Sequence, residues 1–512
     1  MISRTREARF SLFLFSIFVP FFLPNIAIAQ WTPGNFEIYV FDLEQRDSQL
    51  IISPTGKTLL IDVGEANSNS GNGATYIASK LREVMGPSFN HIDYVVPSHL
   101  HLDHIGYAGY GGIWGLIETH GFTIGKLVDR DAGNWIDYND DGVCDPKTEI
   151  EWHHAGKVSG TARNWLCYAT DPANAAKLNR EIALVGSTTQ IDLGGGVNVT
   201  IIGSDAQGVN MVDGVTPLTG DHTDDALPPS ENDYSIALKV SFNQFDYATA
   251  GDTDGEYAES PYGYTYNDVE GILAPRFGHV EMVRANHHGS GHSSSQFYVD
   301  TLDTDVSLIS CGSNSYGHPA QSTLDRLLAT STVYLTNICD TTRNYGDAVI
   351  ANGDIVIQSR DGINYSVNGT PFVATGPTPP PQRYTVNDVK INEVMPDPNI
   401  VYPTEWVELY NPTSQAIDLG GAIIDDIASG GGAPYTIPTD TMIAPYGYWV
   451  LDRTNYFNNA GDDVRLLAPT GTLIDMFTYT SSANDKSWAR MPDGGPWMTT
   501  MNPTPTRGAS NR

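Results

Sequence analysis

Basic residues are scarce in this chain, which has 28 Lys and Arg against 60 Asp and Glu and a formal net charge of −32. Proteins that grip nucleic acid through its phosphates usually display basic patches, so the composition argues against electrostatic capture of a long polyanion. Small phosphodiesters, lactones and other esters fit this charge better. Bound divalent cations can make the local charge positive. Salt or calcium outside the cell would screen the repulsion between the acidic surface and a polyanion.

Cysteine is also scarce, with Cys144, Cys167, Cys311 and Cys339 making up the whole set. No pair has Cys-x-x-Cys spacing, which argues against a structural zinc site built from these residues. An even count in an exported chain favours disulfides. Nearest-neighbour pairing predicts Cys144 with Cys167 and Cys311 with Cys339, although four cysteines allow three pairings.

Long apolar runs are missing beyond the N-terminus. Three arginines lie among the first nine residues, before an apolar stretch at 10–23 and the small-x-small sequence Ala27-Ile28-Ala29. This pattern predicts a signal peptide over residues 1–29 and a secreted chain that is extracellular, periplasmic or on the cell surface. A membrane anchor is the alternative, but the run is short for a spanning helix and two prolines interrupt it.

Potential metal ligands concentrate in residues 98–106, which read Ser-His-Leu-His-Leu-Asp-His-Ile-Gly. An extended run at 92–96 precedes them, and alternation in extended backbone would bring His99, His101 and Asp103 to one point and turn His104 toward a second. Imidazoles and a carboxylate are ligands of zinc-like divalent ions. The pattern therefore predicts a two-metal site, since ordinary core or surface histidines need no common focus.

This motif resembles the His-x-His-x-Asp-His element of the metallo-β-lactamase superfamily. Strand-like runs at 36–42 and 57–64 resemble the family's opening strands, and runs at 236–240 and 247–252 resemble the pair that delivers a bridging aspartate. The resemblance implies an αββα sandwich over about residues 31–370, with two mixed sheets face to face and helices outside. We expect helices at 74–85 and 321–329.

Two further segments resemble the hydrolase domain of ComEC-type competence proteins, whose presumed role is nucleic-acid degradation. They are Asn-His-His-Gly-Ser at 286–290 and Ser-Tyr-Gly-His-Pro at 315–319. The membrane-channel helices of those proteins have no counterpart in the sequence. The resemblance implies two divalent ions, zinc or alternatively manganese, with the metal ligands His99, His101, Asp103, His104, Asp252, His287 and His318.

The same resemblance implies roles for the ligands of the first motif and for Asp252. His99 and His101 would hold one metal, Asp103 and His104 the other, and Asp252 would bridge them. Asp103 would also orient the attacking water, and His288 would protonate a leaving oxygen or grip a phosphate. The sequence leaves the division of roles among His287, His288 and His318 open.

The chain departs from the superfamily at one position. Many members carry a further histidine ligand between the first motif and the bridging aspartate, whereas this interval holds His120, His153, His154 and His222 outside any recognisable motif. His222 is the candidate, with a solvated loop residue as the alternative. One metal position is therefore expected to be poor in ligands.

An insertion at about 126–185 contains the acidic segment Asp137, Asn139, Asp141 and Asp145, with Gly142 where a tight calcium loop needs a glycine. Thr148 stands where an EF-hand has its bidentate glutamate. A calcium turn and a plain acidic surface loop both remain open.

A proline-rich segment predicts a linker over 371–387. Beyond it the chain has neither histidine nor cysteine, and short strand-like runs at 390–394, 405–412, 448–451 and 464–467 suit an antiparallel sandwich. These runs resemble the lamin-tail domain, an all-β immunoglobulin-like module, over 388–511. The resemblance implies cell-surface or extracellular attachment or substrate targeting, with a passive spacer as the alternative.

These features together predict an exported binuclear metal-dependent hydrolase that cleaves phosphodiester bonds, including those of nucleic acid. A hydrolase of a carboxylic ester, lactone or lactam would use the same metals, since a fold alone does not fix the substrate. A surface binding protein with a vestigial metal site is the third hypothesis.

Overall fold

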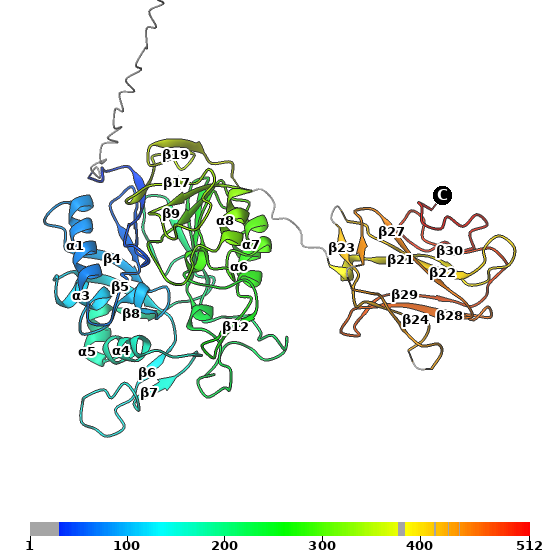
Figure 1. Cartoon of the computed structure of the whole chain (residues 1–512), viewed down its shortest axis with the longest axis horizontal. Helices are drawn as coiled ribbons and strands as arrows, with labels where there is room; N and C mark the ends of the chain where they lie inside the picture. The colour runs from blue at the N-terminus through cyan, green and yellow to red at the C-terminus, as the bar shows by residue number, and fades with distance from the viewer. Residues whose placement is uncertain (1–29, 377–384, 414–415, 429, 440, 512) are drawn as a thin grey trace, which may run out of the picture. The chain divides into compact units, whose positions relative to one another are not determined.

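The structure is a computed structural model that describes residues 30–376, 385–413, 416–428, 430–439 and 441–511. The chain forms two units, Met1–Pro380 and Pro381–Arg512, and each is described by itself (Figure 1). The predicted signal peptide and the centre of the predicted linker lie outside the described residues. Within the described part of the chain, no helix is long and apolar enough to cross a membrane.

Two mixed sheets form the centre of the first unit. The nine strands of one sheet are, in spatial order, β20 (Thr370–Val373), β19 (Asn364–Val367), β18 (Ile355–Ser359), β1 (Phe36–Val40), β2 (Gln49–Ile52), β3 (Thr58–Ile61), β4 (His91–Val96), β5 (Thr123–Asp129) and β8 (Arg180–Ile182). The seven strands of the other are β17 (Val349–Ile350), β16 (Thr332–Leu335), β15 (Val306–Ile309), β14 (Met282–Arg284), β11 (Phe245–Thr249), β10 (Ala237–Phe242) and β9 (Val197–Gly203).

Helices cover the outer faces of these sheets. Figure 1 shows α1 (Asn72–Met85), α3 (Gly112–Glu118), α4 (Gly160–Ala169) and α5 (Pro172–Leu178) on one side of the unit, and α6 (Glu270–Phe277), α7 (Gln296–Leu302) and α8 (Gln321–Leu328) on the other. In α1, residues Ala74, Ile77, Ala78, Leu81 and Val84 are buried, and this spacing gives the helix one apolar face for the sheet.

The core between the sheets is apolar and draws on both. Phe36, Ile38 and Val40 of β1 pack in one cluster with Val199 of β9 and Leu238 of β10. The clusters that contain α1 and α6 lie on the outer faces. This layering confirms the predicted αββα sandwich, and the expected helices are present as α1 and α8.

The predicted insertion, 126–185, begins inside β5 and ends three residues beyond β8, both strands of the first sheet. Between them lie α4, α5 and the hairpin of β6 (Gly133–Trp135) and β7 (Ile150–Trp152). The pairing of Cys144 with Cys167 and of Cys311 with Cys339 is confirmed. At the far edge, β20 pairs with β19, so the sheet continues past the predicted boundary at residue 370.

The second unit is all β apart from the short 3-10 turn η3 (Val386–Asp388). One sheet has the order β27 (Tyr448–Arg453), β22 (Glu405–Tyr410), β21 (Lys390–Met395) and β30 (Trp488–Ala489), and another the order β25 (Tyr435–Thr436), β24 (Ile423–Asp425), β28 (Asp462–Leu467) and β29 (Leu473–Tyr479). A small pair joins β23 (Ile417–Asp418) and β26 (Met442–Ile443). The core of the second unit contains Val394, Val407, Ile424 and Val464, and all of these except Ile424 lie in the strand-like runs of the sequence.

Candidate metal centre

The residues of the candidate site follow the carboxyl ends of strands in both sheets. Asp62 follows β3 and His99 follows β4, while Asp252 follows β11 and His287 follows β14. Strands β3 and β4 are parallel, as are β11 and β14, so each pair ends at one edge. That edge is where open α/β sheets place their ligands.

The first motif does not remain extended throughout. A short helix, α2 (Leu102–Ile105), begins directly after His101. The alternation that would bring Asp103 to the same point as His99 and His101 is therefore wrong, because a helical turn sends Asp103 and His104 to the other side. This is the division that the family resemblance implies.

Backbone hydrogen bonds hold α2 against the end of β3. Val63 N donates to His104 O at 2.6 Å, and Glu65 N donates to Leu102 O at 3.0 Å. A Cβ at Gly64 would lie 1.9 Å from Asp103 O. The Asp62-x-Gly64 sequence is thus required for close approach of the two segments.

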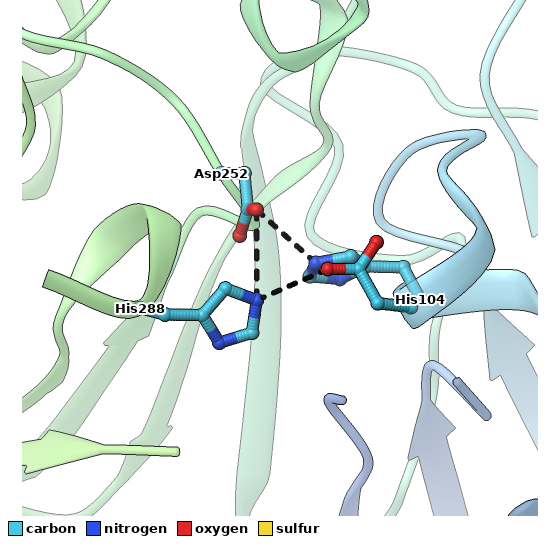
Figure 2. A group of neighbouring side chains, drawn as sticks. His104, Asp252 and His288 are labelled. Carbon is cyan, nitrogen blue, oxygen red and sulfur yellow. Dashed lines mark ion pairs between the residues drawn. The ribbon is translucent and has the colours of Figure 1, made fainter. Parts of the chain in front are cut away.

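Four side chains converge on one point between the sheets (Figure 2). Asp252 Oδ2 lies 3.2 Å from His104 Nε2 and 3.7 Å from His288 Nε2, and Asp103 Oδ2 lies 3.6 Å from His288 Nε2. One potential ligand atom from each residue lies within 4.8 Å of the others. His104 Nε2 and His288 Nε2, which both face Asp252 Oδ2, are buried without a hydrogen-bond partner among the described residues. Such a donor set fits a divalent cation.

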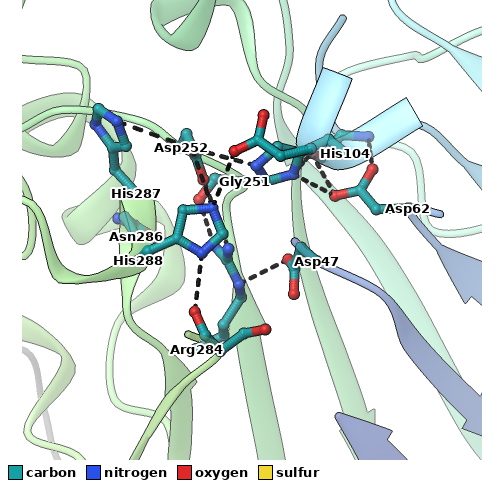
Figure 3. A network of polar contacts seen from close by, with 12 residues as sticks. Asp47, Asp62, His104, Gly251, Asp252, Arg284, Asn286, His287 and His288 are labelled. Carbon is teal, nitrogen blue, oxygen red and sulfur yellow. Dashed lines mark hydrogen bonds and ion pairs between the residues drawn. The ribbon is translucent and has the colours of Figure 1, made fainter. Parts of the chain in front are cut away.

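The outer nitrogens of both imidazoles are held by oxygen atoms (Figure 3). Asp62 Oδ2 lies 2.8 Å from His104 Nδ1, and Ser310 O lies 2.9 Å from His288 Nδ1. A carbonyl oxygen accepts only, so Nδ1 of His288 carries the proton and its Nε2 lone pair faces the centre. This outer contact is how metal-binding histidines are usually oriented.

A buried guanidinium supports the aspartate from behind. Arg284 donates to Gly251 O at 2.6 Å, and its nitrogens lie 2.8 Å from Asp47 Oδ2 and 3.5 Å from Asp252 Oδ1. All three side chains are buried. The contacts, drawn in Figure 3, fix the carboxylate that the resemblance assigns as the bridge.

The pKa values of His104 and Asp252 are shifted in opposite directions. Burial lowers the pKa of His104, but the carboxylates of Asp252 and Asp62 outweigh burial and raise it well above its usual range. Burial raises the pKa of Asp252, but the neighbouring imidazoles, His104 first among them, lower it well below normal. A cation that binds here would displace protons, which makes its affinity pH-dependent.

His99 and His101 form a second focus beside the first. His99 Nε2 lies 3.0 Å from His101 Nδ1, and the His99 ring centroid is 4.2 Å from that of His104. Burial, together with the neighbouring His104 and His101, lowers the pKa of His99 well below its usual value. A lowered pKa favours the neutral imidazole, which is the form that binds a metal.

His287 and His318 lie at the opening, with ring centroids 5.0 Å apart. Burial lowers the pKa of His287, but Asp254 and Asp252 raise it to about 9. Burial, with the charges of His287 and His288, lowers the pKa of His318 to about 3. His287 and His288 both have positive φ, at 48° and 50°, a left-handed conformation that is uncommon for non-glycine residues.

Sequence reasoning missed Asn232 in the 3-10 turn η1 (Glu231–Tyr234). Its Nδ2 lies 3.3 Å from His287 Nδ1, and its Oδ1 is buried without a partner among the described residues. Glu231 ties this turn to the motif by accepting from Leu100 N at 2.9 Å. A lone Asn-Asp pair gives no sequence signal that would have singled it out.

The other histidines of the interval lie elsewhere. His222 pairs with Asp225 at 2.9 Å, His153 pairs with Asp131 at 2.7 Å, and His154 Nδ1 accepts from Gly220 N. Among the residues that the structure describes, no histidine and carboxylate cluster that could hold a metal includes any of them.

The acidic loop of the insertion is exposed. Asp137 accepts from Asp141 N and Gly142 N, Asn139 also accepts from Asp141 N, and Asp145 accepts from Lys147 N. The oxygens thus close the loop on itself, and calcium binding there stays a prediction.

A cavity of about 610 Å³ opens over the centre. The described residues that line it include His101, Asp103, Asn232, Asp252, His287, His288 and His318, several tyrosines, and neither lysine nor arginine. Whatever enters the cavity meets acidic, imidazole, hydroxyl and aromatic groups.

A family model described as Lamin Tail Domain matches residues 382–481. This match confirms the predicted lamin-tail domain in the second unit. No curated protein matches the chain.

Among solved structures, the chain is similar to Zn²⁺-bound PqqB from Methylobacterium extorquens, with 10% identity, 56% of this chain and 85% of that chain covered, and a TM-score of 0.29. It is also similar to a Thermotoga maritima protein described as a Zn-dependent hydrolase of the metallo-β-lactamase superfamily, with 9% identity, coverage of 61% and 96%, and a TM-score of 0.24. A Parabacteroides distasonis protein described as a metal-dependent hydrolase matches with 10% identity, coverage of 58% and 98%, and a TM-score of 0.27. At these scores, the chemistry has to be inferred from the site itself.

Proposed function

We propose that the first unit is a binuclear metal-dependent hydrolase that cleaves phosphodiester bonds. The observation that carries this proposal is the convergence of His104 Nε2 and His288 Nε2 on Asp252 Oδ2, because both nitrogens are buried without a hydrogen-bond partner among the described residues. An unpaired buried polar atom costs free energy, so two at one point beside a carboxylate indicate a ligand that completes them.

The residues divide into two sets around Asp252. His104, His288 and Asp103 would hold one ion with Asp252, and His99 and His101 would hold the other. Zinc suits these nitrogen and oxygen ligands, with manganese as the alternative. When bound, the two ions would lower the pKa of water and polarise the bond under attack.

Asn232 is the residue that we assign to the ligand-poor position. Its side chain lines the cavity, its Nδ2 lies 3.3 Å from His287 Nδ1, and its buried Oδ1 has no partner among the described residues. An amide oxygen is a weaker ligand for zinc than imidazole, so we expect the ion beside His99 and His101 to bind less tightly than the other.

Proton transfer falls to His287 in this proposal. His288 is engaged as a ligand, whereas His287 Nδ1 contacts Asp254 Oδ1 at 3.1 Å and its side chain lines the cavity. Asp254 would hold the imidazole in place while it protonates the leaving oxygen. Asp103 would orient the attacking water, as the motif predicts.

The phosphodiester class is supported by the two ComEC-like segments, which supply His287, His288 and His318 to one cavity. A carboxylic ester, lactone or lactam is the second candidate, and the observation that favours it is the lack of lysine and arginine among the described lining residues. A phosphate would depend on the ions for positive charge.

We also propose that the protein is exported and that the lamin-tail domain attaches it to a cell surface or to extracellular material. Two disulfides support export, because such bonds persist in oxidising compartments. The N-terminal pattern of arginines and an apolar run is the second support.

The test is metal analysis of the purified protein together with parallel assays on bis-p-nitrophenyl phosphate, single-stranded DNA and a panel of esters and lactones. We expect about two bound ions and metal-dependent cleavage of the diesters. Cleavage of esters alone would favour the second candidate. Protein that neither retains nor takes up zinc or manganese would support a vestigial site.

A further inference from the structure

Tyrosines gather at the mouth of the cavity above the metal centre. Tyr262, Tyr264, Tyr266 and Tyr316 all line it. Tyr262 is 75% exposed and Tyr316 is 73% exposed, which is unusual for large aromatic side chains. They come from two separate segments, the hairpin of β12 (Ala258–Glu259) and β13 (Thr265–Tyr266) and the loop after β15.

The hairpin is held firmly despite its exposed tip. Ser260 N donates to Tyr264 O at 2.8 Å, and Tyr262 N donates to Ser260 Oγ at 3.0 Å. Thr265 is tied to the segment before η1, because Ser230 N donates to Thr265 O and Thr265 N to Pro228 O. Tyr262 is thus presented at a fixed place relative to Asn232.

The second segment is equally constrained. Asn314 Oδ1 accepts from the backbone N of Tyr316, Gly317 and His318 at 2.9 to 3.1 Å. The Tyr316 ring stacks on His318, with centroids 6.0 Å apart and an interplanar angle of 16°. When a planar group stacks on a ring that is already held in place, the protein loses little further conformational freedom.

We propose that Tyr262 and Tyr316 are specificity-determining residues that stack against a nucleobase next to the bond being cleaved. This inference rests on the proposed phosphodiesterase function and names the substrate class as a nucleotide diester or a short single strand. Every base has an aromatic face, so stacking binds it without sequence preference. A double helix would hide these faces.

The charge of the molecule favours this binding mode. The net charge is −32, and the described lining residues include neither lysine nor arginine. Contacts to successive phosphates are therefore weak, and affinity for a nucleotide has to come from uncharged groups beside the ions. The exposed tyrosines are the groups at the cavity that can supply it.

The experiment compares two diesters with the same leaving group, ethyl p-nitrophenyl phosphate and thymidine 5′-(p-nitrophenyl phosphate), on the metal-loaded full chain. The ratio of their kcat/KM values isolates the contribution of the nucleoside. We expect Tyr262→Ala and Tyr316→Ala each to lower the preference for the thymidine ester by about tenfold, mainly through KM.

Tyr262→Phe and Tyr316→Phe keep the ring and should restore the preference. Tyr138→Ala is the matched control, since Tyr138 is 65% exposed and is absent from the described lining. An unchanged ratio in both alanine variants would overturn the inference. If the native protein cleaves neither diester, the proposed function itself fails, and circular dichroism would separate misfolding from a loss of stacking.

Discussion

In the first unit, the buried carboxylates of Asp62 and Asp252 face imidazoles and a guanidinium, whereas in the second unit those of Glu393 and Glu408 face amides and hydroxyls. Asn392 Nδ2 and Gly508 N donate to Glu408 at 2.9 and 2.6 Å. Ser487, Asn502 and Thr506 donate to Glu393. Both groups are buried acids in a strongly acidic chain.

The two arrangements differ in what remains unsatisfied. The two imidazole nitrogens that face Asp252, His104 Nε2 and His288 Nε2, have no hydrogen-bond partner among the described residues, while the carboxylate oxygens of Glu393 and Glu408 are all engaged. Burial alone therefore does not identify a functional acid. The unsatisfied atoms indicate a ligand in the first unit, and the satisfied ones indicate that the second unit uses its acids to fasten its C-terminal segment.

The largest expected effect comes from removing the central carboxylate. Asp252→Ala should lower phosphodiesterase kcat/KM by about a thousandfold, because several kcal/mol of metal-dependent stabilisation are lost. Steady-state assays with bis-p-nitrophenyl phosphate measure it. Glu408→Gln, which removes a buried acid from the second unit, serves as the control and should leave turnover intact; equal losses in both variants would erase the contrast between the units.

The next largest expected effect is a loss of stability of the second unit as the pH rises. Burial, with Glu393 and Asp493 nearby, raises the pKa of Glu408 from 4.5 to about 7. A raised pKa means that its contribution to stability is full below about pH 4.5 and is lost as the pH rises through about 7, a change of roughly 3 kcal/mol. Hydrogen exchange in β21 and β22 should therefore be faster at pH 8 than at pH 5.

Glu408→Gln should flatten this pH dependence, because the amide does not titrate. The exchange rates are compared in the full chain after correction for the intrinsic effect of pH. A slope that is the same in both proteins would show that another group controls the stability of the second unit.

Loss of the contact that orients the His104 imidazole should have a smaller effect. Asp62→Asn removes the charge that faces His104 Nδ1 at 2.8 Å and should weaken metal affinity by about ten- to a hundredfold. Competition with a chromogenic chelator measures the affinity. Asp475→Asn, which removes a carboxylate paired with Arg490 in the second unit, is the control, and an equal loss there would point to a general charge effect.

The metal-ligand motif and several helices and strands were predictable from the sequence because their patterns are local. His99, His101, Asp103 and His104 lie within six residues, and α1 and α8 carry an apolar face at helical spacing. The strand-like runs in the second unit became β21, β22, β27 and β28 for a similar reason, since their pattern repeats over a few residues.

Features that depend on distant contacts were not predictable. The turn into α2 is stabilised by hydrogen bonds from Val63 and Glu65, so the alternation of the preceding strand misplaced Asp103. Asn232 and Arg284 reach the centre only through the packing of η1 and β14 beside it. The sheet continues past residue 370 for a different, local reason, because β20 forms a tight hairpin with β19.

The smallest effect should follow from removing the second unit. Each unit has its own apolar core, so a chain that ends at residue 380 should turn over small diesters within about twofold of the full chain. Binding to cell-surface material, measured by sedimentation, should be lost. A large fall in small-diester turnover would mean that the second unit supports the centre directly.

The most direct test is a crystal structure with diffraction data collected on both sides of the zinc absorption edge. We predict an anomalous peak coordinated by His104, Asp252 and His288, and a second, weaker one beside His99 and His101. Full data from zinc-soaked crystals without a peak at the first position, with these side chains hydrogen-bonded to water alone, would contradict the account.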